Sequence, residues 1–170
     1  EKNAIELSDL LGIKPEEVMR ISAKNGINVK EVLDKVVEKV PPPKGNLDSP
    51  LRALIFDSKY DSYKGVIAFV RIRDGKIRQG EKIYLIAERE AGDSKEIGFF
   101  TPALQSHPEL KAGDIGYIAT GIKEPGKVKT GDTITLYQFI RSDSNSVELL
   151  PGYKNPQPMV YISIFPENSD

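Results

Sequence analysis

The chain has 170 residues, 39% of them hydrophobic, which is enough for one complete domain and part of a second. Its 24 Lys and Arg residues balance 25 Asp and Glu residues, so the total charge gives no reason to expect a polyanionic partner. The absence of cysteine excludes disulfides, thiolate metal sites and cysteine nucleophiles. No apolar run approaches the ~20 residues of a membrane span, so we expect a soluble, cytoplasmic protein.

The first 45 residues carry two helical patterns. Residues 4–11 place apolar side chains at helical spacing and end at Gly12, a residue that commonly follows a helix. Residues 29–40 repeat this pattern with valine and leucine, and Asn28 with Glu31 predicts a capping box at the start. The chain begins with Glu1 inside a helical pattern, so we expect it to be a segment of a longer polypeptide.

Between the two helices, the apolar residues Val18 to Ile21 predict a strand that leads into Ser22, Ala23 and Lys24. Asn25-Gly26 then precedes the second helix. A loop between a strand and a helix start is where α/β nucleotide-binding folds present free backbone amides. The tripeptide alone is weak evidence, because an ordinary turn has the same composition.

Three prolines, at positions 41–43, and Lys44-Gly45-Asn46 follow the second helix and predict a semi-rigid linker at a domain boundary. Beyond it, short runs rich in β-forming residues alternate with Gly, Asp and Pro, which predicts an all-β domain over residues 46–141. The six expected strands are Leu51–Phe56, Val66–Arg73, Lys82–Ala87, Lys95–Phe100, Ile115–Thr120 and Thr133–Tyr137.

The dipeptide Asp74-Gly75 predicts a tight hairpin after the second of these strands. Alternation along that strand places Arg71 and Arg73 on one face with Ile67 and Phe69. Lys76 and Arg78 follow the turn, so four cations are expected near one hairpin. A solvated surface and a nucleic-acid contact are both consistent with this pattern.

Tyr60 and Tyr63 lie beside Lys59 and Lys64, a combination that suits stacking on nucleic-acid bases but also ordinary loop packing. Residues 142–148 are polar and rich in serine. Residues 158–166 begin and end with proline, and the side chains between them follow an alternating pattern. This pattern predicts a strand whose sheet partners lie outside the chain.

The remaining polar residues do not form a catalytic group. Asp57, Asp61 and Asp114 have no accompanying His, Cys or metal-ligand cluster, so we expect them to cap turns. His107 lies between Ser106 and a proline in a loop, where we expect it to be solvated. We therefore expect no catalytic residue and no metal site.

Several motifs resemble one family. Residues 22–26, the second helix and the proline exit resemble the last guanine-binding motif of translational GTPases and their connection to domain II. The run Asp57-Ser58 with Tyr60-Asp61-Ser62-Tyr63-Lys64-Gly65 resembles domain II of the LepA family, also called elongation factor 4. Residues 98–102, 110–117, 131–133 and 151–153 continue the resemblance, which covers essentially the whole chain.

The resemblance implies a mainly β fold with three parts. These are the last strand and helix of an α/β GTP-binding domain at residues 1–45, a six-stranded translation-factor β-barrel (domain II) at 46–141, and a linker with the first strand of an α+β domain (domain III) at 142–170. It also implies that the Ala23 amide, oriented by Ser22, contacts the guanine carbonyl oxygen while the Lys24 stem packs on the base.

The resemblance further implies a ribosome-binding GTP hydrolase that uses GTP and Mg²⁺ in the full-length parent, with back-translocation on elongating or maturing ribosomes as its activity. Peripheral membrane association of the parent is also implied. The implied partners are the small-subunit ribosomal RNA and protein. Candidate contacts are Arg71, Arg73, Lys76, Arg78, Tyr60, Tyr63 and Lys64.

Because the phosphate-binding and catalytic motifs are absent from these 170 residues, we expect this segment alone to be inactive and to need no cofactor. Two alternatives remain open from the sequence. The parent could be an EF-G-like or ribosomal-protection GTPase, or the chain could be a non-enzymatic β-barrel binding module.

Overall fold

The structure is a computed structural model, and it describes residues 2–141, 147–151 and 162. The chain divides into two compact units, residues 1–42 and residues 43–170. Pro43 to Asn46, the last four of the six residues of the predicted linker, therefore belong with the second unit. The two units are described separately.

The first unit contains two helices, α1 (Lys2–Leu11) and α2 (Val29–Lys39), with a 3₁₀ turn, η1 (Pro15–Glu17), between them. Gly12 ends α1 in a left-handed conformation with φ of +66°, as a glycine after a helix commonly does. Both predicted helices are confirmed, because their apolar period of 3.6 residues outweighs the β preference of the valines.

The predicted capping box at the start of α2 is wrong. Asn28 has a left-handed backbone, with φ of 58°, and its side chain makes no cap hydrogen bond. Instead, Asn28 Nδ2 donates to the Arg20 carbonyl oxygen at 2.9 Å. The side chain thus fastens the residues before the loop to the start of the helix.

Apolar side chains of this unit are largely exposed, including Leu10 (80%), Leu33 (62%) and Val37 (84%). Val18 to Ile21 join no strand ladder with the described residues, so the strand predicted there stays a prediction. Helices with an unburied apolar face are typical of a layer that packs on further secondary structure.

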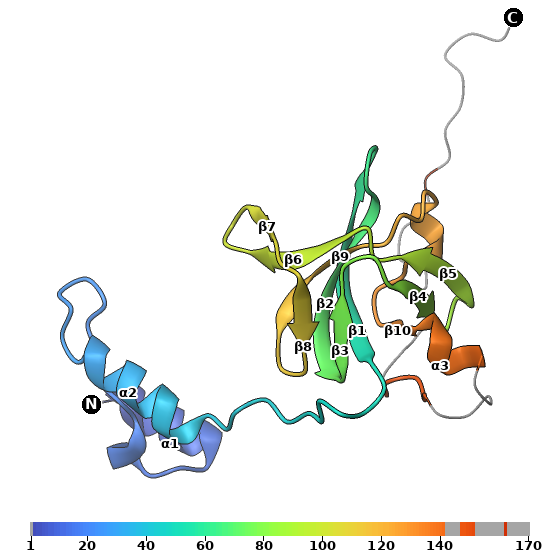
Figure 1. The fold of residues 1–170 in the computed structure, drawn as a ribbon. Coiled ribbons are helices and arrows are strands. Elements are labelled where there is room, and N and C mark those ends of the chain that lie inside the picture. The colour runs from blue at the N-terminus through green and yellow to red at the C-terminus, as the bar shows by residue number, and fades with distance from the viewer. Residues whose placement is uncertain (1, 142–146, 152–161, 163–170) are drawn as a thin grey trace, which may run out of the picture. The chain divides into compact units, whose positions relative to one another are not determined.

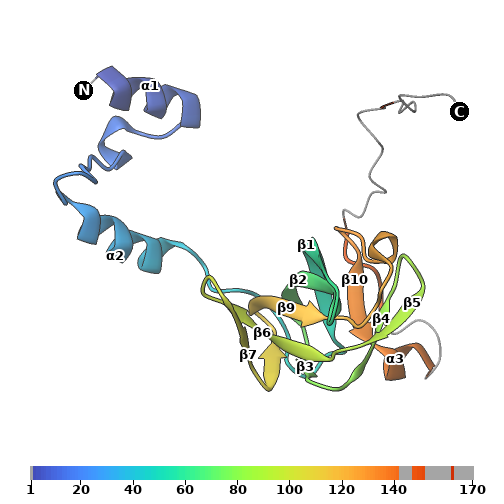
Figure 2. The ribbon, with the colours of Figure 1, turned by 90° about the horizontal axis from the view of Figure 1, so that it is seen from above.

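The second unit is built on a curved antiparallel sheet of eight strands in the order β5-β4-β10-β1-β2-β9-β6-β7 (Figures 1 and 2). Its strands are β1 (Arg52–Asp61), β2 (Gly65–Asp74), β4 (Lys82–Leu85), β5 (Glu90–Asp93), β6 (Glu96–Phe100), β7 (Leu104–Ser106), β9 (Ile115–Ala119) and β10 (Thr133–Leu136). The unit also contains a two-stranded sheet, β3 (Lys76–Arg78) with β8 (Glu109–Lys111), a 3₁₀ turn η2 (Pro125–Lys127) and a short helix α3 (Tyr137–Arg141).

The mainly β prediction is confirmed, and each of the six expected strands is present. Four short strands, β3, β5, β7 and β8, were not predicted, because three or four residues are too few to show an alternating pattern. The eight-stranded ladder does not close into a ring. The end of β5 nevertheless lies beside the end of β9, because the Asp93 amide donates to the Thr120 carbonyl oxygen at 3.0 Å.

The hairpin predicted at Asp74-Gly75 is wrong. Gly75 does make a turn, with φ of +70°, but the following strand β3 pairs with β8 and not with β2. The dipeptide therefore marks the corner at which the chain leaves the large sheet for the small one. The strand predicted at 158–166 lies, apart from Ile162, outside the described residues.

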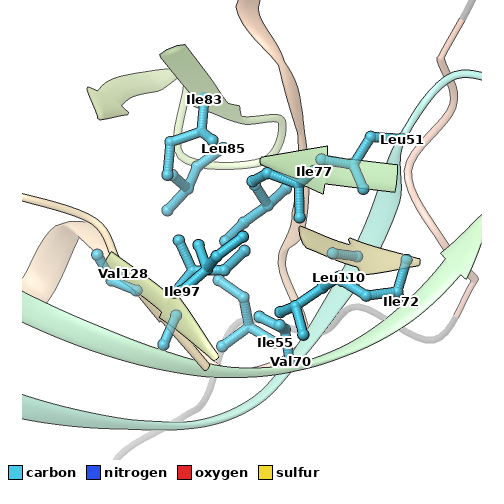
Figure 3. Packing of buried hydrophobic residues seen from close by; sticks show 14 of the residues in the cluster. Leu51, Ile55, Val70, Ile72, Ile77, Ile83, Leu85, Ile97, Leu110 and Val128 are labelled. Carbon is cyan, nitrogen blue, oxygen red and sulfur yellow. The ribbon is translucent and has the colours of Figure 1, made fainter. Parts of the chain in front are cut away.

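Aliphatic side chains from both sheets fill one core inside the curve of the large sheet. Ile55 and Val70 from β1 and β2, Ile77 from β3 and Leu110 from β8 point toward one another (Figure 3). The alternate residues of β2 face outward, where Ile67 packs with Tyr117 and Phe69. The small sheet thus covers one side of the core. No helix among the described residues is long and apolar enough to cross a membrane.

Gly75 offers a test of this corner. A Cβ at this position would lie 2.7 Å from both the Leu51 amide nitrogen and the Ser49 carbonyl oxygen. We expect Gly75→Ala to lower the free energy of unfolding by about 2 kcal/mol or more, because left-handed strain adds to a backbone clash. Urea denaturation followed by circular dichroism measures this loss.

Gly80→Ala is the matched control. Gly80 also has a left-handed φ, +88°, but a Cβ there meets nothing within 4 Å. We expect this control to lose only about 1 kcal/mol. Equal losses in the two variants would contradict the clash at Gly75.

Candidate functional site

The turn between β1 and β2, residues 60–64, is called the tip. The Asp61 carboxylate accepts hydrogen bonds from the amides of Lys64 at 2.8 Å and Tyr63 at 2.9 Å. These two bonds, that from Lys64 first, lower the pKa of Asp61. Lys123 Nζ donates to the carbonyl oxygens of Ser62 and Tyr63 at 2.8 and 3.1 Å. The tip is therefore held from inside by a carboxylate and from a neighbouring loop by an ammonium group.

A second set of contacts fastens the tip to the sheet. Lys64 Nζ lies 2.7 Å from Glu96 Oε1, and the Tyr117 hydroxyl donates to the same oxygen at 2.6 Å. Lys64, followed by Tyr117, lowers the pKa of Glu96. Burial, together with Glu96, raises the pKa of Tyr117 well above its ordinary value. Glu96 therefore stays ionised at neutral pH and joins the tip to β6 and β9.

The tip presents aromatic side chains to solvent. Tyr63 is 88% exposed and Tyr60 is 49% exposed, while Lys59 beside them is exposed. Several hydrogen bonds already hold the backbone of the tip. Contact between these rings and a partner would therefore cost little backbone conformational entropy. Lys64 serves the ion pair with Glu96, so its charge is partly neutralised within the protein.

The other candidate cations lie at the opposite end of the β1–β2 pair. Arg71 and Arg73 are exposed on the outer face of β2, as alternation predicts. Lys76 and Arg78 are exposed on β3, in the small sheet. Arg78 Nε lies 2.9 Å from Glu109 Oε2, and Lys76 pairs in register with Lys111.

The candidate contacts therefore form two groups and not one cluster. A ten-residue strand such as β2 spans roughly 30 Å, so the tip and the arginines lie at well-separated ends of one strand pair. In the structure Lys123 belongs to the tip and Arg52 belongs to the group of arginines. Neither residue could be identified from the sequence. Lys123 comes 60 residues after Tyr63, and Arg52 reads as an ordinary strand residue.

The loop at Ser22 is a closed turn in the first unit. The Ile27 and Asn25 amides both donate to the Ser22 carbonyl oxygen, at 3.1 and 3.2 Å, and the Ser22 amide donates back to Ile27. The amides of Ala23 and Lys24 take no part in these bonds, and both residues are exposed. The loop thus presents two backbone donors, which suits contact with a carbonyl oxygen of a base.

The turn-capping role predicted for Asp61 and Asp114 is confirmed, but Asp57 lies within strand β1 and not in a turn. Asp57 Oδ1 accepts the Ser58 amide and Asp114 Oδ2 accepts the Lys111 amide, both at 2.8 Å, as Asp61 does in the tip. His107 is exposed and its ring lies edge-on to Phe99 at 5.2 Å. Within the described ranges, no group of three His, Cys, Asp or Glu side chains could hold a metal ion.

Glu96 generates a pH-dependent prediction. Because its pKa in the folded chain lies below the ordinary value of 4.5, its stabilising effect is present above pH 4.5 and is lost as the pH falls through the folded pKa. We expect Glu96→Gln to lower the free energy of unfolding by about 1 kcal/mol at neutral pH, and by much less near about pH 3. Urea titrations at the two pH values measure the difference.

Glu124→Gln is the control, because the Glu124 side chain is 71% exposed and only touches Lys127 at 3.3 Å. This variant should match the unsubstituted chain at both pH values. A loss for Glu96→Gln that is equal at neutral and acid pH would show that the carboxylate charge is not what holds the tip.

Comparisons with known proteins show what the chain resembles. The family described as elongation factor Tu domain 2 matches residues 65–135. The chain is 45% identical to elongation factor 4 of Thermotoga maritima over 98% of its own length, and 46% identical to elongation factor 4 of Clostridium perfringens over 95%. It spans only about a quarter of these relatives, 26% of each.

Solved structures support the fold. A bacterial selenocysteine-specific elongation factor matches with a TM-score of 0.60 at 16% identity, over 81% of this chain and 23% of that one. Translation elongation factor SelB of Methanococcus maripaludis, in complex with a GTP analogue, matches with a TM-score of 0.64 at 19% identity, over 80% of this chain and 30% of that one. Identity at 41–46% over nearly the whole chain, with the matching β domain, makes the chain similar to one part of the elongation factor 4 proteins.

Proposed function

We propose that this chain is the docking segment of a ribosome-binding GTPase, with residues 46–141 leaning on the small ribosomal subunit. The parent would hydrolyse GTP with Mg²⁺ and act on elongating or maturing ribosomes, with back-translocation as its activity. Residues 1–45 would complete the GTP-binding domain, and residues 142–170 would begin the next domain. The exposed apolar faces of α1 and α2 support the first of these assignments, because an α/β domain would cover them.

The tip is the observation that carries the docking proposal. Tyr63 is the most exposed of the described aromatic side chains, yet its backbone is held by Asp61 and Lys123. A rigid backbone with a projecting ring suits stacking on an unpaired RNA base. Arg71 and Arg73 at the far end would neutralise phosphates, and Lys76, Arg78, Tyr60 and Lys64 are the remaining proposed contacts.

The loop at Ser22 would contact the guanine base in the parent. The Ala23 amide would donate to the guanine carbonyl oxygen, Ser22 would fix the turn, and the Lys24 stem would cover the base. GTP bound there supplies the phosphoanhydride that the parent hydrolyses. This segment contributes only base contacts, so its own residues orient the nucleotide and do not act on the phosphates.

Docking is tested by competition for isolated small ribosomal subunits. We expect the unsubstituted chain to displace the labelled full-length parent at low salt, and Tyr63→Ala to compete about ten-fold less well, because one base–aromatic stack contributes about 1–3 kcal/mol. The measurement is the concentration for half-displacement in a sedimentation assay.

Leu47→Ala is the matched control, because Leu47 is also an exposed apolar side chain (51%) and lies outside the tip. It should compete like the unsubstituted chain. Failure of the unsubstituted chain to displace the parent at low salt would refute the docking role.

The guanine contact is tested in the full-length parent. Ala23→Pro removes the proposed amide donor, and we expect GDP affinity to fall about ten-fold or more, since a buried acceptor loses its partner. Fluorescent GDP titration measures the change. Ala23→Ser keeps the amide and should bind normally, and normal binding by Ala23→Pro would exclude the contact.

A further inference from the structure

A second feature of the β domain lies where the arginines of β1 and β2 meet the end of the described chain. It is a hollow of about 410 Å³. The residues that line it are Arg52, Leu54, Arg71, Arg73, Leu150 and Pro151. Three arginines thus line a single hollow. Arg52 is the member that the sequence did not reveal.

Arg52 is held in place by a carboxylate. Its Nε and Nη2 donate to Asp74 Oδ2 at 3.0 and 2.7 Å, and the Asp74 side chain is only 13% exposed. The other oxygen, Oδ1, accepts the Asn46 amide at 3.1 Å. Burial raises the pKa of Asp74, but Arg52 and Asn46 together hold it below the ordinary value. Asp74 therefore fixes one edge of the guanidinium and leaves the other edge for a ligand.

Arg73 lies at a β-bulge. In the β1–β2 ladder, Arg52 pairs with Asp74 and the next residue, Ala53, pairs with Ile72, so Arg73 is the extra residue with no partner opposite. Bulges of this kind redirect a side chain. Arg71, two residues earlier and opposite Leu54, shares the exposed face. Two residues along a strand cover roughly 6.6 Å, a spacing comparable to that of consecutive phosphates in a nucleic-acid strand.

The apolar side of the hollow is also fixed. Leu150 is 8% exposed, and its amide donates to Thr133 Oγ1 on β10 at 2.9 Å. Leu54 and Pro151 complete this wall. A lining that combines cations with carbon suits a phosphate attached to a sugar, because the sugar carbons can cover the apolar residues while the phosphate oxygens accept the N–H groups.

We propose that Arg52, Arg71 and Arg73 form one binding site for backbone phosphates of RNA, with Asp74 as the residue that positions Arg52. The site rests on the proposed docking function for its choice of RNA. The lining holds three arginines and no acidic residue, and Asp74 pairs with Arg52, so the site carries excess positive charge for an anion. Guanidinium groups bind phosphate through paired N–H donors, which lysine in their place could not reproduce.

The test uses the whole chain and two probes, pyrophosphate and a fluorescein-labelled single-stranded RNA. We expect pyrophosphate to shift the NMR signals of the Nε–H groups of Arg52, Arg71 and Arg73 and to leave that of Arg89 unchanged. Arg52→Gln, Arg71→Gln and Arg73→Gln should each weaken RNA binding about five- to ten-fold. Each should also reduce the dependence of log affinity on log salt by about one.

Arg89→Gln is the matched control, because it removes the same charge from an exposed arginine elsewhere on the domain. Arg52→Lys keeps the positive charge and should still bind the RNA several-fold more weakly than the unsubstituted chain. This variant separates the effect of guanidinium geometry from the effect of charge. If Arg52→Gln unfolds, the exposed Arg71 and Arg73 variants still decide the result. RNA binding by these two that equals that of Arg89→Gln would overturn the site.

Other outcomes separate this site from the docking function. Small-subunit binding by the unsubstituted chain, without any effect of the arginine variants on RNA, would leave docking in place and remove this site. Pyrophosphate shifts confined to the three arginines, without small-subunit binding, would support the site and refute docking. A poly-glutamate peptide that displaces the RNA at lower concentration than unlabelled RNA does would overturn the choice of RNA.

Discussion

The buried carboxylate of Asp74 is the constraint on which one end of the β domain depends. A carboxylate that is only 13% exposed must have its charge and lone pairs satisfied, and the chain meets this need with Arg52 on β1 and the Asn46 amide. The Gly75 amide in turn donates to the Asn46 carbonyl oxygen at 2.8 Å. One ionised group thus joins the first strand, the bulge of β2 and the arriving linker.

Glu96 has a similar role at the other end of the same strand pair. It joins Lys64 of the tip to Tyr117 of β9, so the long β1–β2 pair is held at both ends by an ionised carboxylate. Between these ends the inner face of β2 packs into the aliphatic core. The proposed base-stacking tip and the proposed phosphate site are therefore parts of one rigid element. A rigid element can present two separated contacts without losing order on binding.

The sequence predicted the parts of this fold that have a clear period or a clear family motif. The helices α1 and α2 and the longer strands follow from apolar spacing, and the turn roles of Asp61 and Asp114 follow from their side-chain chemistry. Predictions from neighbouring residues failed where residues distant in the sequence determine the pairing of a strand or the partner of a side chain. Asp74-Gly75 has hairpin composition, but β8, more than 30 residues later, captures the strand that follows it. Arg52 and Lys123 were missed because their partners lie 22 and 60 residues away.

The linker is bonded to the same end of the β domain as Asp74. Asn46 is bonded to Asp74 and Gly75, a Cβ on Gly45 would lie 2.4 Å from the Arg73 carbonyl oxygen, and a Cβ on Gly113 would lie 3.3 Å from Pro43. The linker from Pro43 onward is therefore packed on the β domain, in agreement with the division of the chain at residue 42. Arg73 contacts this packed linker through its backbone and the proposed phosphate through its side chain. A bound RNA phosphate would therefore act on the residue against which the entering chain is seated.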